Sequence, residues 1–105
     1  MKIRHKRTSP EKDFSDDLRA FMRVKGWHTE KTHGSMFMSG WPDILAFHNH
    51  HGQIWIETKA GNNKLSESQR KKFKVWSDYG AKIYVIKSLS EYMLLFREPN
   101  WIHYV

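Results

Sequence analysis

The chain has 105 residues, a length that corresponds to one domain with a modest core. Its 39% hydrophobic and 14% aromatic content is normal for a folded protein, so composition argues against global disorder. The absence of cysteine excludes disulfides and thiolate metal sites. A net charge of +7 and a pI of about 9.8 favour a polyanionic partner.

No apolar run approaches the ~20 residues that a membrane span requires, and the basic N-terminus lacks the apolar segment of a signal peptide. We therefore expect a cytoplasmic protein without membrane association. The first nine residues are expected to form a flexible basic arm, and residues 10–105 a single domain.

The first helix is predicted to begin at Pro10, with Ser9 as its N-cap, and to end before Gly26. Apolar residues recur at helical spacing along it, from Phe14 onward. Glu11 lies three residues before Phe14, so we expect its side chain on the inward-facing stripe.

The remaining elements are predicted in this order: strands at 27–31, 42–47 and 53–59, a helix at 66–79, a strand at 82–86 and a short helix at 90–97. Ser66 and Gln69 form a capping-box pattern, and Ser90 is the expected cap of the last helix. A right-handed crossover through the 66–79 helix makes the last strand parallel to the third. The predicted fold class is α/β, a mixed sheet flanked by helices.

Two carboxylates and a lysine stand out in this pattern. Glu57 and Lys59 share one face of their strand, which on an ordinary exposed strand indicates a solvated ion pair. In a hairpin turning near 49–52, however, Asp43 comes roughly opposite Glu57, and the two carboxylates can converge on a hard cation such as Mg²⁺. The carbonyl of Thr58 offers one more oxygen, and Lys59 can steady a phosphate or a water.

Three segments carry a resemblance to a known family: Gly-Trp-Pro-Asp-Ile-Leu at 40–45, Ile-Glu-Thr-Lys-Ala-Gly at 56–61 and Lys-Leu-Ser-Glu-Ser-Gln at 64–69. Together they resemble the VRR-NUC family of the PD-(D/E)XK nuclease superfamily. The resemblance implies a restriction-endonuclease-like αβββαβ core and an Mg²⁺- or Mn²⁺-dependent nuclease. Small stand-alone members, often from phages, are dimeric enzymes that cut branched DNA such as four-way junctions.

Carried over onto this sequence, the resemblance implies that Asp43 and Glu57 are metal ligands and that Lys59 is the catalytic lysine. Gln69 matches the family's glutamine on the following helix, near the phosphate or the attacking water. The family's first-helix glutamate corresponds to Glu11, as a metal ligand and catalytic residue. Three neighbouring acids compete for that position: Asp13, Asp16 and Asp17.

Basic and polar residues around these motifs are candidates for contacts to DNA phosphates, although such runs also occur on ordinary solvated faces. These candidates are Lys6, Arg7, His33, Ser35, Lys64, Arg70, Lys71 and Lys74. Phe73 and Trp76 are expected to give the 66–79 helix its core stripe, with its cations facing outward.

Two further features have competing interpretations. The histidines at 48, 50 and 51 suggest a zinc site, but a solvated turn is favoured because they lack spaced partners. The apolar residues Met36, Phe37, Met38 and Trp41 belong either to the core or to a dimer contact or DNA wedge. Residues 93–96 and 101–104 offer a second dimer surface.

The leading hypothesis is a metal-dependent endonuclease of branched DNA, a Holliday-junction-resolving homodimer. A flap- or duplex-cutting nuclease of the same chemistry and a non-catalytic DNA-binding module remain alternatives, and RNA remains open as a substrate. A sequence-specific restriction-like nuclease is disfavoured because little chain is left for base readout.

Overall fold

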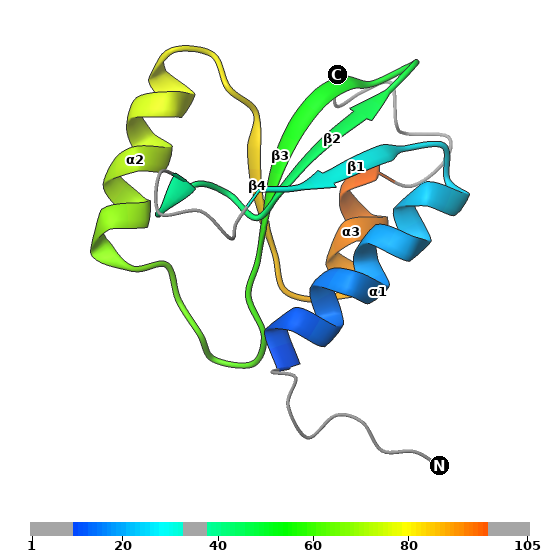
Figure 1. Ribbon diagram of the computed structural model, residues 1–105, viewed down its shortest axis with the longest axis horizontal. Helices are drawn as coiled ribbons and strands as arrows, with labels where there is room; N and C mark the ends of the chain where they lie inside the picture. The colour runs from blue at the N-terminus through cyan, green and yellow to red at the C-terminus, as the bar shows by residue number, and fades with distance from the viewer. Residues whose placement is uncertain (1–9, 33–37, 97–105) are drawn as a thin grey trace.

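The computed structural model describes residues 10–32 and 38–96. Along the chain its elements are α1 (Pro10–Val24), β1 (His28–Lys31), β2 (Ile44–His48), β3 (Gly52–Thr58), α2 (Glu67–Asp78), β4 (Ile83–Ile86) and α3 (Leu89–Phe96). Figure 1 shows the sheet between α2 on one side and α1 with α3 on the other. The predicted elements are all present, with boundaries displaced by at most two residues.

The four strands form one mixed sheet in the order β1-β2-β3-β4. The pairs β1–β2 and β2–β3 are antiparallel, whereas β3 and β4 are parallel. The connection from β3 to β4 runs through α2, as the predicted crossover requires. The α/β fold class with a mixed sheet is therefore confirmed, and β4 is an edge strand.

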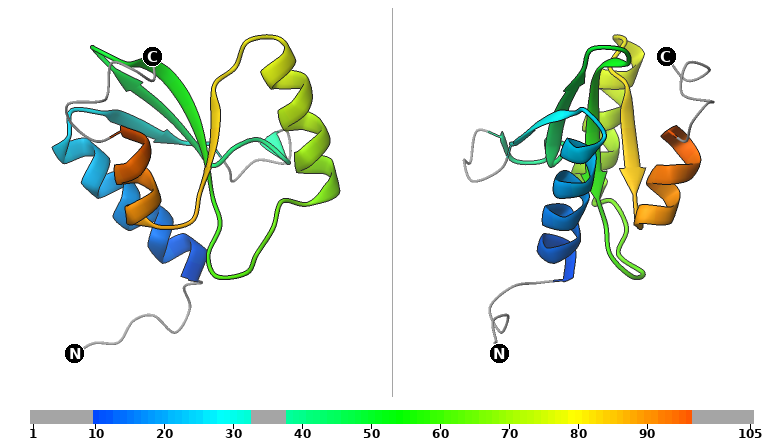
Figure 2. Two further views of the ribbon diagram at one scale, coloured as in Figure 1. Left: turned by 180° about the vertical axis from the view of Figure 1, so that it is seen from behind. Right: turned by 90° about the vertical axis from the view of Figure 1, so that its right-hand side faces the viewer.

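Side-chain alternation along β3 assigns its two faces to different helices. Ile54 and Ile56 point to the side of α1 and α3, where they join a buried cluster with Leu18 of α1 and Tyr92 of α3. Trp55 points to the opposite side, and its ring lies 4.9 Å from that of Trp76 on α2. Figure 2 shows the same layers from behind and from the side.

The core on the α1 and α3 side is formed mainly by aliphatic and aromatic residues. Ile44, Ile56 and Ile86 come from three adjacent strands and are 0% exposed. Burying each such side chain contributes roughly 1.5–3 kcal/mol, so this core supplies much of the force that keeps β3 in place. Trp27 also donates a buried hydrogen bond of 3.0 Å from Nε1 to the hydroxyl of Tyr92.

Helix termini follow local rules with one correction. Gly26 ends α1 at φ +98°, and the N–H of Trp27 returns to the carbonyl of Met22 at 3.0 Å. The predicted cap of α3 at Ser90 is wrong: the hydroxyl of Ser88 accepts from the N–H of Glu91. Ser88 and Glu91 have the capping-box spacing, and that pattern decides the helix start.

The β2–β3 hairpin corrects the interpretation of the histidine turn. His51 is 3% exposed and stacks on Trp27 at 6.0 Å, with Phe96 at 6.5 Å. Burial, followed by the charges of His48 and His50, lowers the pKa of His51 to about 4. A solvated turn is therefore the wrong description for His51, which closes one end of the core.

In the described part of the chain, the helices are too short or too polar to cross a membrane. The predicted basic arm at 1–9 and the apolar tail at 101–104 lie outside the described residues. Met36 and Phe37 lie outside them too, whereas Trp41 packs against Trp55 and Trp76 at 6.0 and 5.3 Å, in support of the core interpretation.

Candidate active site

The β2–β3 hairpin brings the predicted carboxylates together. Its register pairs Ile44 with Ile56, so the same register continued by one residue sets Asp43 opposite Glu57. The Oδ2 atom of Asp43 accepts hydrogen bonds from the backbone N–H of Thr58 at 3.0 Å and from the Thr58 hydroxyl at 2.7 Å. Asp43 is thereby attached to the end of β3, one residue from Glu57.

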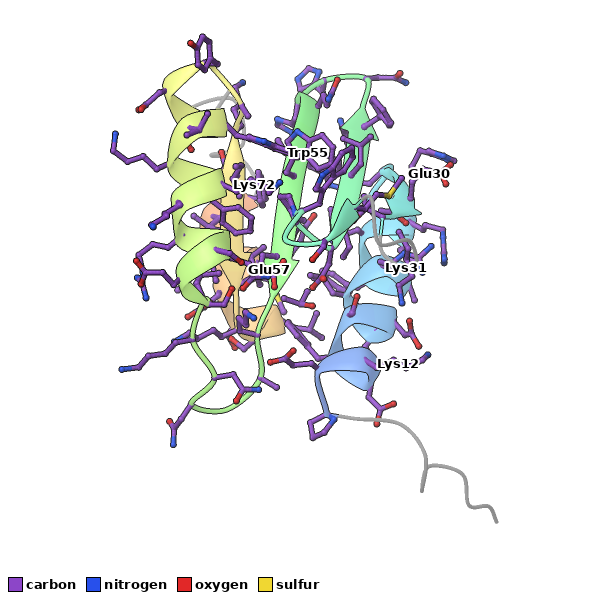
Figure 3. All side chains as sticks on the ribbon, turned by 60° about the vertical axis from the view of Figure 1, so that its left-hand side comes forward. Lys12, Glu30, Lys31, Trp55, Glu57 and Lys72 are labelled. Atoms are coloured by element: carbon purple, nitrogen blue, oxygen red, sulfur yellow. The ribbon has the colours of Figure 1, made fainter. Side chains whose placement is uncertain are left out.

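Glu57 is a buried carboxylate with two different oxygens. It is 2% exposed, and its Oε2 accepts from Gln69 Nε2 at 2.9 Å and lies 3.3 Å from Lys59 Nζ. Its Oε1 has no hydrogen-bond partner among the described residues. Figure 3 shows Glu57 between β3 and α2.

The surroundings of Glu57 disfavour its ionised form. Burial raises the pKa of Glu57, the charge of Asp43 raises it further, and the contacts with Gln69 and Lys59 only partly compensate. A buried carboxylate held close to another, with one oxygen unpaired, is costly unless something else pairs it. Carboxylates whose pKa is raised in this way are frequent at functional sites.

Lys59 and Gln69 hold Glu57 from two elements. Lys59 continues the β3–β4 ladder, donating its N–H to the carbonyl of Ile86 at 3.2 Å, and its side chain is 12% exposed. Gln69 lies in the first turn of α2, where its Oε1 accepts from the N–H of Ser66 at 3.1 Å. The capping box thus fixes the same side chain that donates to Glu57.

Glu11 lies beside this site and shares no hydrogen-bond partner with Asp43 or Glu57 among the contacts described above. Its Oε2 accepts from the amide of Asn63 and from the N–H of Ala60 at 3.5 Å, in the loop that follows Lys59. Across residues 10–32 and 38–96, no group of three or more histidine, aspartate or glutamate side chains is arranged to hold a metal ion. The structure therefore brings Asp43 and Glu57 together but does not group Glu11 with them.

The donor atoms at this site suit a small divalent cation. Mg²⁺ prefers oxygen ligands and usually keeps several waters beside one or two carboxylates. Glu57 Oε1 is a buried acceptor without a partner in the described residues, and Asp43 is the neighbouring carboxylate. The N–H of Thr58 points toward Asp43, and its carbonyl points to the same side because both groups of a strand residue do so. The residues fit a metal held by two carboxylates and a backbone oxygen.

Comparison with known proteins agrees with this architecture. No family model matches the sequence, and no curated protein matches it significantly. A solved structure described as a VRR_NUC domain superposes with a TM-score of 0.74, covering 88% of this chain and 99% of that one, at 19% sequence identity. This chain has the fold of a VRR_NUC domain. At this identity the likeness concerns the fold, and roles for individual residues rest on the geometry above.

The VRR_NUC fold places some of the expected DNA-binding residues beside the site. Lys64 and Arg70 line a pocket together with Lys59. Arg70, Lys71 and Lys74 line a second, shallower one on the outer side of α2. Lys74 is also paired with Asp78 at 3.0 Å, which reduces its charge toward a partner. The other four candidates, Lys6, Arg7, His33 and Ser35, lie outside the described residues.

Two lysines near the site were not among the site residues predicted from the sequence. Lys72, like the other cations of this helix, was expected to face outward. It is instead half-buried and points from α2 toward the sheet (Figure 3). There it lies close to Gly40, where an added Cβ would stand 3.3 Å from the Cε of Lys72. Its spacing from Gln69 and Trp76 already indicates this inward side. Lys87 lines the same pocket as Lys59, and only the parallel β3–β4 pairing reveals that.

Proposed function

We propose that this protein is a metal-dependent endonuclease that hydrolyses phosphodiesters in DNA. The observation that carries the proposal is Glu57, a buried carboxylate with one oxygen unpaired among the described residues and the other held by Lys59 and Gln69. The VRR_NUC fold supports the same chemistry, because the structure it resembles is named for a nuclease domain. The net charge of +7 suits a DNA substrate.

In this proposal Asp43 and Glu57 hold Mg²⁺ or Mn²⁺, with the Thr58 carbonyl as a further ligand. The bound cation supplies Lewis acidity to the phosphate and lowers the pKa of a bound water. Its charge also offsets the cost of ionising Glu57 in a buried position.

The three remaining polar side chains are assigned positioning and charge stabilisation. Lys59 is a compact cation at the edge of the buried site and stabilises charge that develops on the phosphate. Gln69 donates to Glu57 and keeps the carboxylate oriented, with its unpaired oxygen free to bind. Glu11, through Ala60 and Asn63, holds the loop that follows Lys59.

We further propose that the substrate is branched DNA, cut by a homodimer at a Holliday junction. A two-fold dimer presents two equivalent sites to the two-fold junction. Met93 and Leu94 on α3 are 45% and 61% exposed and provide an apolar surface for such a dimer.

Cleavage of labelled four-way junction, flap and linear duplex DNA, in Mg²⁺ and in Mn²⁺, tests this function. Lys59→Ala and Asp43→Asn should abolish cleavage, and asparagine keeps an oxygen for Thr58. Glu30→Gln, which neutralises an exposed carboxylate on β1, is the matched control and should cleave normally. Paired symmetric cuts in the four-way junction support the junction-resolving dimer. Cutting of flaps or linear duplex instead would keep the nuclease chemistry but identify a different DNA substrate. Binding without cutting by the unmutated protein indicates a DNA-binding module instead.

A further inference from the structure

A basic pocket of about 330 Å³ adjoins the candidate active site. Four cations line it, contributed by three different parts of the chain, and its apolar surface comes from Leu65 and Val85. The cations are Lys59, Lys64, Arg70 and Lys87. No acidic side chain is among the described residues that line it, so the pocket presents positive charge almost alone.

The parallel pairing of β3 and β4 explains why this pocket is continuous with the site. Glu57 pairs with Val85 in the register, so Val85 lies on the face of the sheet that carries Glu57 and Lys59. Lys87 follows two residues later and reaches the same pocket as Lys59. Because β4 is the edge strand of the sheet formed by residues 10–32 and 38–96, an extended ligand can leave the pocket past it without meeting another strand of that sheet.

The cations of the pocket are differently engaged. Lys59 pairs with Glu57, and Arg70 donates to the backbone carbonyl of Leu65 at 3.4 Å. Among the ion pairs of the described ranges, none involves the side chain of Lys64 or Lys87. The nearby Glu91 accepts from the backbone N–H of Lys87 instead. Exposed lysine charges around an acid-free pocket favour an anion, and the apolar surface fits the sugar that carries it.

We propose that this pocket, here called the Lys87 pocket, binds the phosphodiester adjacent to the scissile one, with Lys87 and Lys64 as its principal contacts. The proposal rests on the proposed nuclease function, because it takes Lys59 as the residue shared by the two phosphates. Lys87 is then a substrate-positioning residue contributed by the edge of the sheet. Its contact determines the path that the DNA strand takes beyond the scissile phosphate.

The first test measures DNA binding by fluorescence anisotropy without Mg²⁺, and cleavage kinetics with it. Lys87→Ala should raise Kd and KM roughly tenfold, leave kcat within about twofold, and reduce the salt slope of binding by about one. Lys82→Ala is the matched control, since it removes the same charge from the other end of the same edge strand. The proposal is overturned if the two variants bind DNA equally well.

The second test locates the phosphate. A neutral methylphosphonate is placed on either side of the cut found with the unmutated protein. At one position it should weaken binding by the unmutated protein but not by Lys87→Ala, because the contact is already lost. A 5′-terminal phosphate that restores binding instead would overturn the assignment to an internal phosphodiester.

The outcomes separate this inference from the nuclease proposal. If the unmutated protein cuts DNA and Lys87→Ala has an unchanged KM, the nuclease function stands and the pocket assignment is wrong. If nothing is cut but Lys87→Ala still weakens DNA binding relative to Lys82→Ala, the pocket binds DNA phosphate, but the proposed chemistry fails and the assignment to a phosphodiester beside the scissile one fails with it.

Discussion

Replacing Gln69 by alanine should destabilise the protein and disturb the site together, because one side chain serves both. Gln69 Oε1 accepts from the N–H of Ser66, and its Nε2 donates to the buried Glu57 at 2.9 Å. A hydrogen bond to a charged group contributes about 1.5–3 kcal/mol. The cap bond, which is exposed, adds about 0.5–1 kcal/mol. Alanine's higher helix propensity recovers only a few tenths of a kcal/mol.

The expected loss for Gln69→Ala is therefore about 2–4 kcal/mol in the free energy of unfolding. Ser66→Ala provides the control, because it removes the hydroxyl that accepts from the Gln69 N–H but leaves the contact with Glu57 in place. That variant should lose only about 1 kcal/mol. Urea titrations of the metal-free proteins measure both values.

Cleavage kinetics give a second readout of the same bond. Without the Gln69 donor, the pKa of Glu57 should rise further, so the acidic limb of the pH–rate profile should move to higher pH. Ser66→Ala should leave that limb in place. Equal urea midpoints for the two variants, or an unmoved acidic limb in Gln69→Ala, would refute the view that Gln69 supports Glu57.

Three other changes test separate features. The raised pKa of Glu57 means that its protonated form stabilises the folded protein, and this contribution is lost as pH rises through the folded pKa. Urea titrations from pH 4 to 7 should therefore show the metal-free protein losing stability relative to Glu57→Gln. Because the pKa of His51 is lowered to about 4, the stability that neutral His51 contributes is fully present above pH 6.5 and is lost as pH falls toward 4. Urea titrations over that range should show the unmutated protein losing up to about 3 kcal/mol in the free energy of unfolding relative to His51→Phe. Gly40→Ala and Gly61→Ala should each cost about 1–2 kcal/mol, because both residues have a positive φ, +81° and +59°. Gly40→Ala should cost more, because its added Cβ meets Lys72 at 3.3 Å and that of Gly61 meets nothing within 4 Å; thermal unfolding that ranks them in the opposite order would contradict the close approach of Lys72.

Local rules explain what could be predicted from the sequence. The α1 start at Pro10 and the Ser66–Gln69 capping box depend on residues within one helical turn, and both predictions are confirmed. The approach of Asp43 to Glu57 depends on a hairpin with a short turn, whose register, continued by one residue, sets the two opposite each other. The period of two along β3 then assigns Glu57 and Lys59 to one face.

Other features arise from contacts between residues far apart in the chain. Glu57 is buried and has a raised pKa because α2 covers its face of the sheet, and no local pattern distinguishes it from a solvated glutamate. His51 is buried because Trp27 and Phe96 pack against it from distant segments. Burial and pKa are collective properties of packing, so a strand pattern alone cannot supply them.

The sequence by itself thus determined the order of the elements and the residues able to do chemistry, because propensity, capping and alternation act over a few positions. The tertiary structure decided which of those residues share an environment. Glu11 bonds the loop after Lys59 instead of joining Asp43 and Glu57, and Lys87 enters the pocket beside Lys59 through the parallel pairing of β3 with β4. Both outcomes depend on how the elements pack, and that packing is set by burial of the core as a whole.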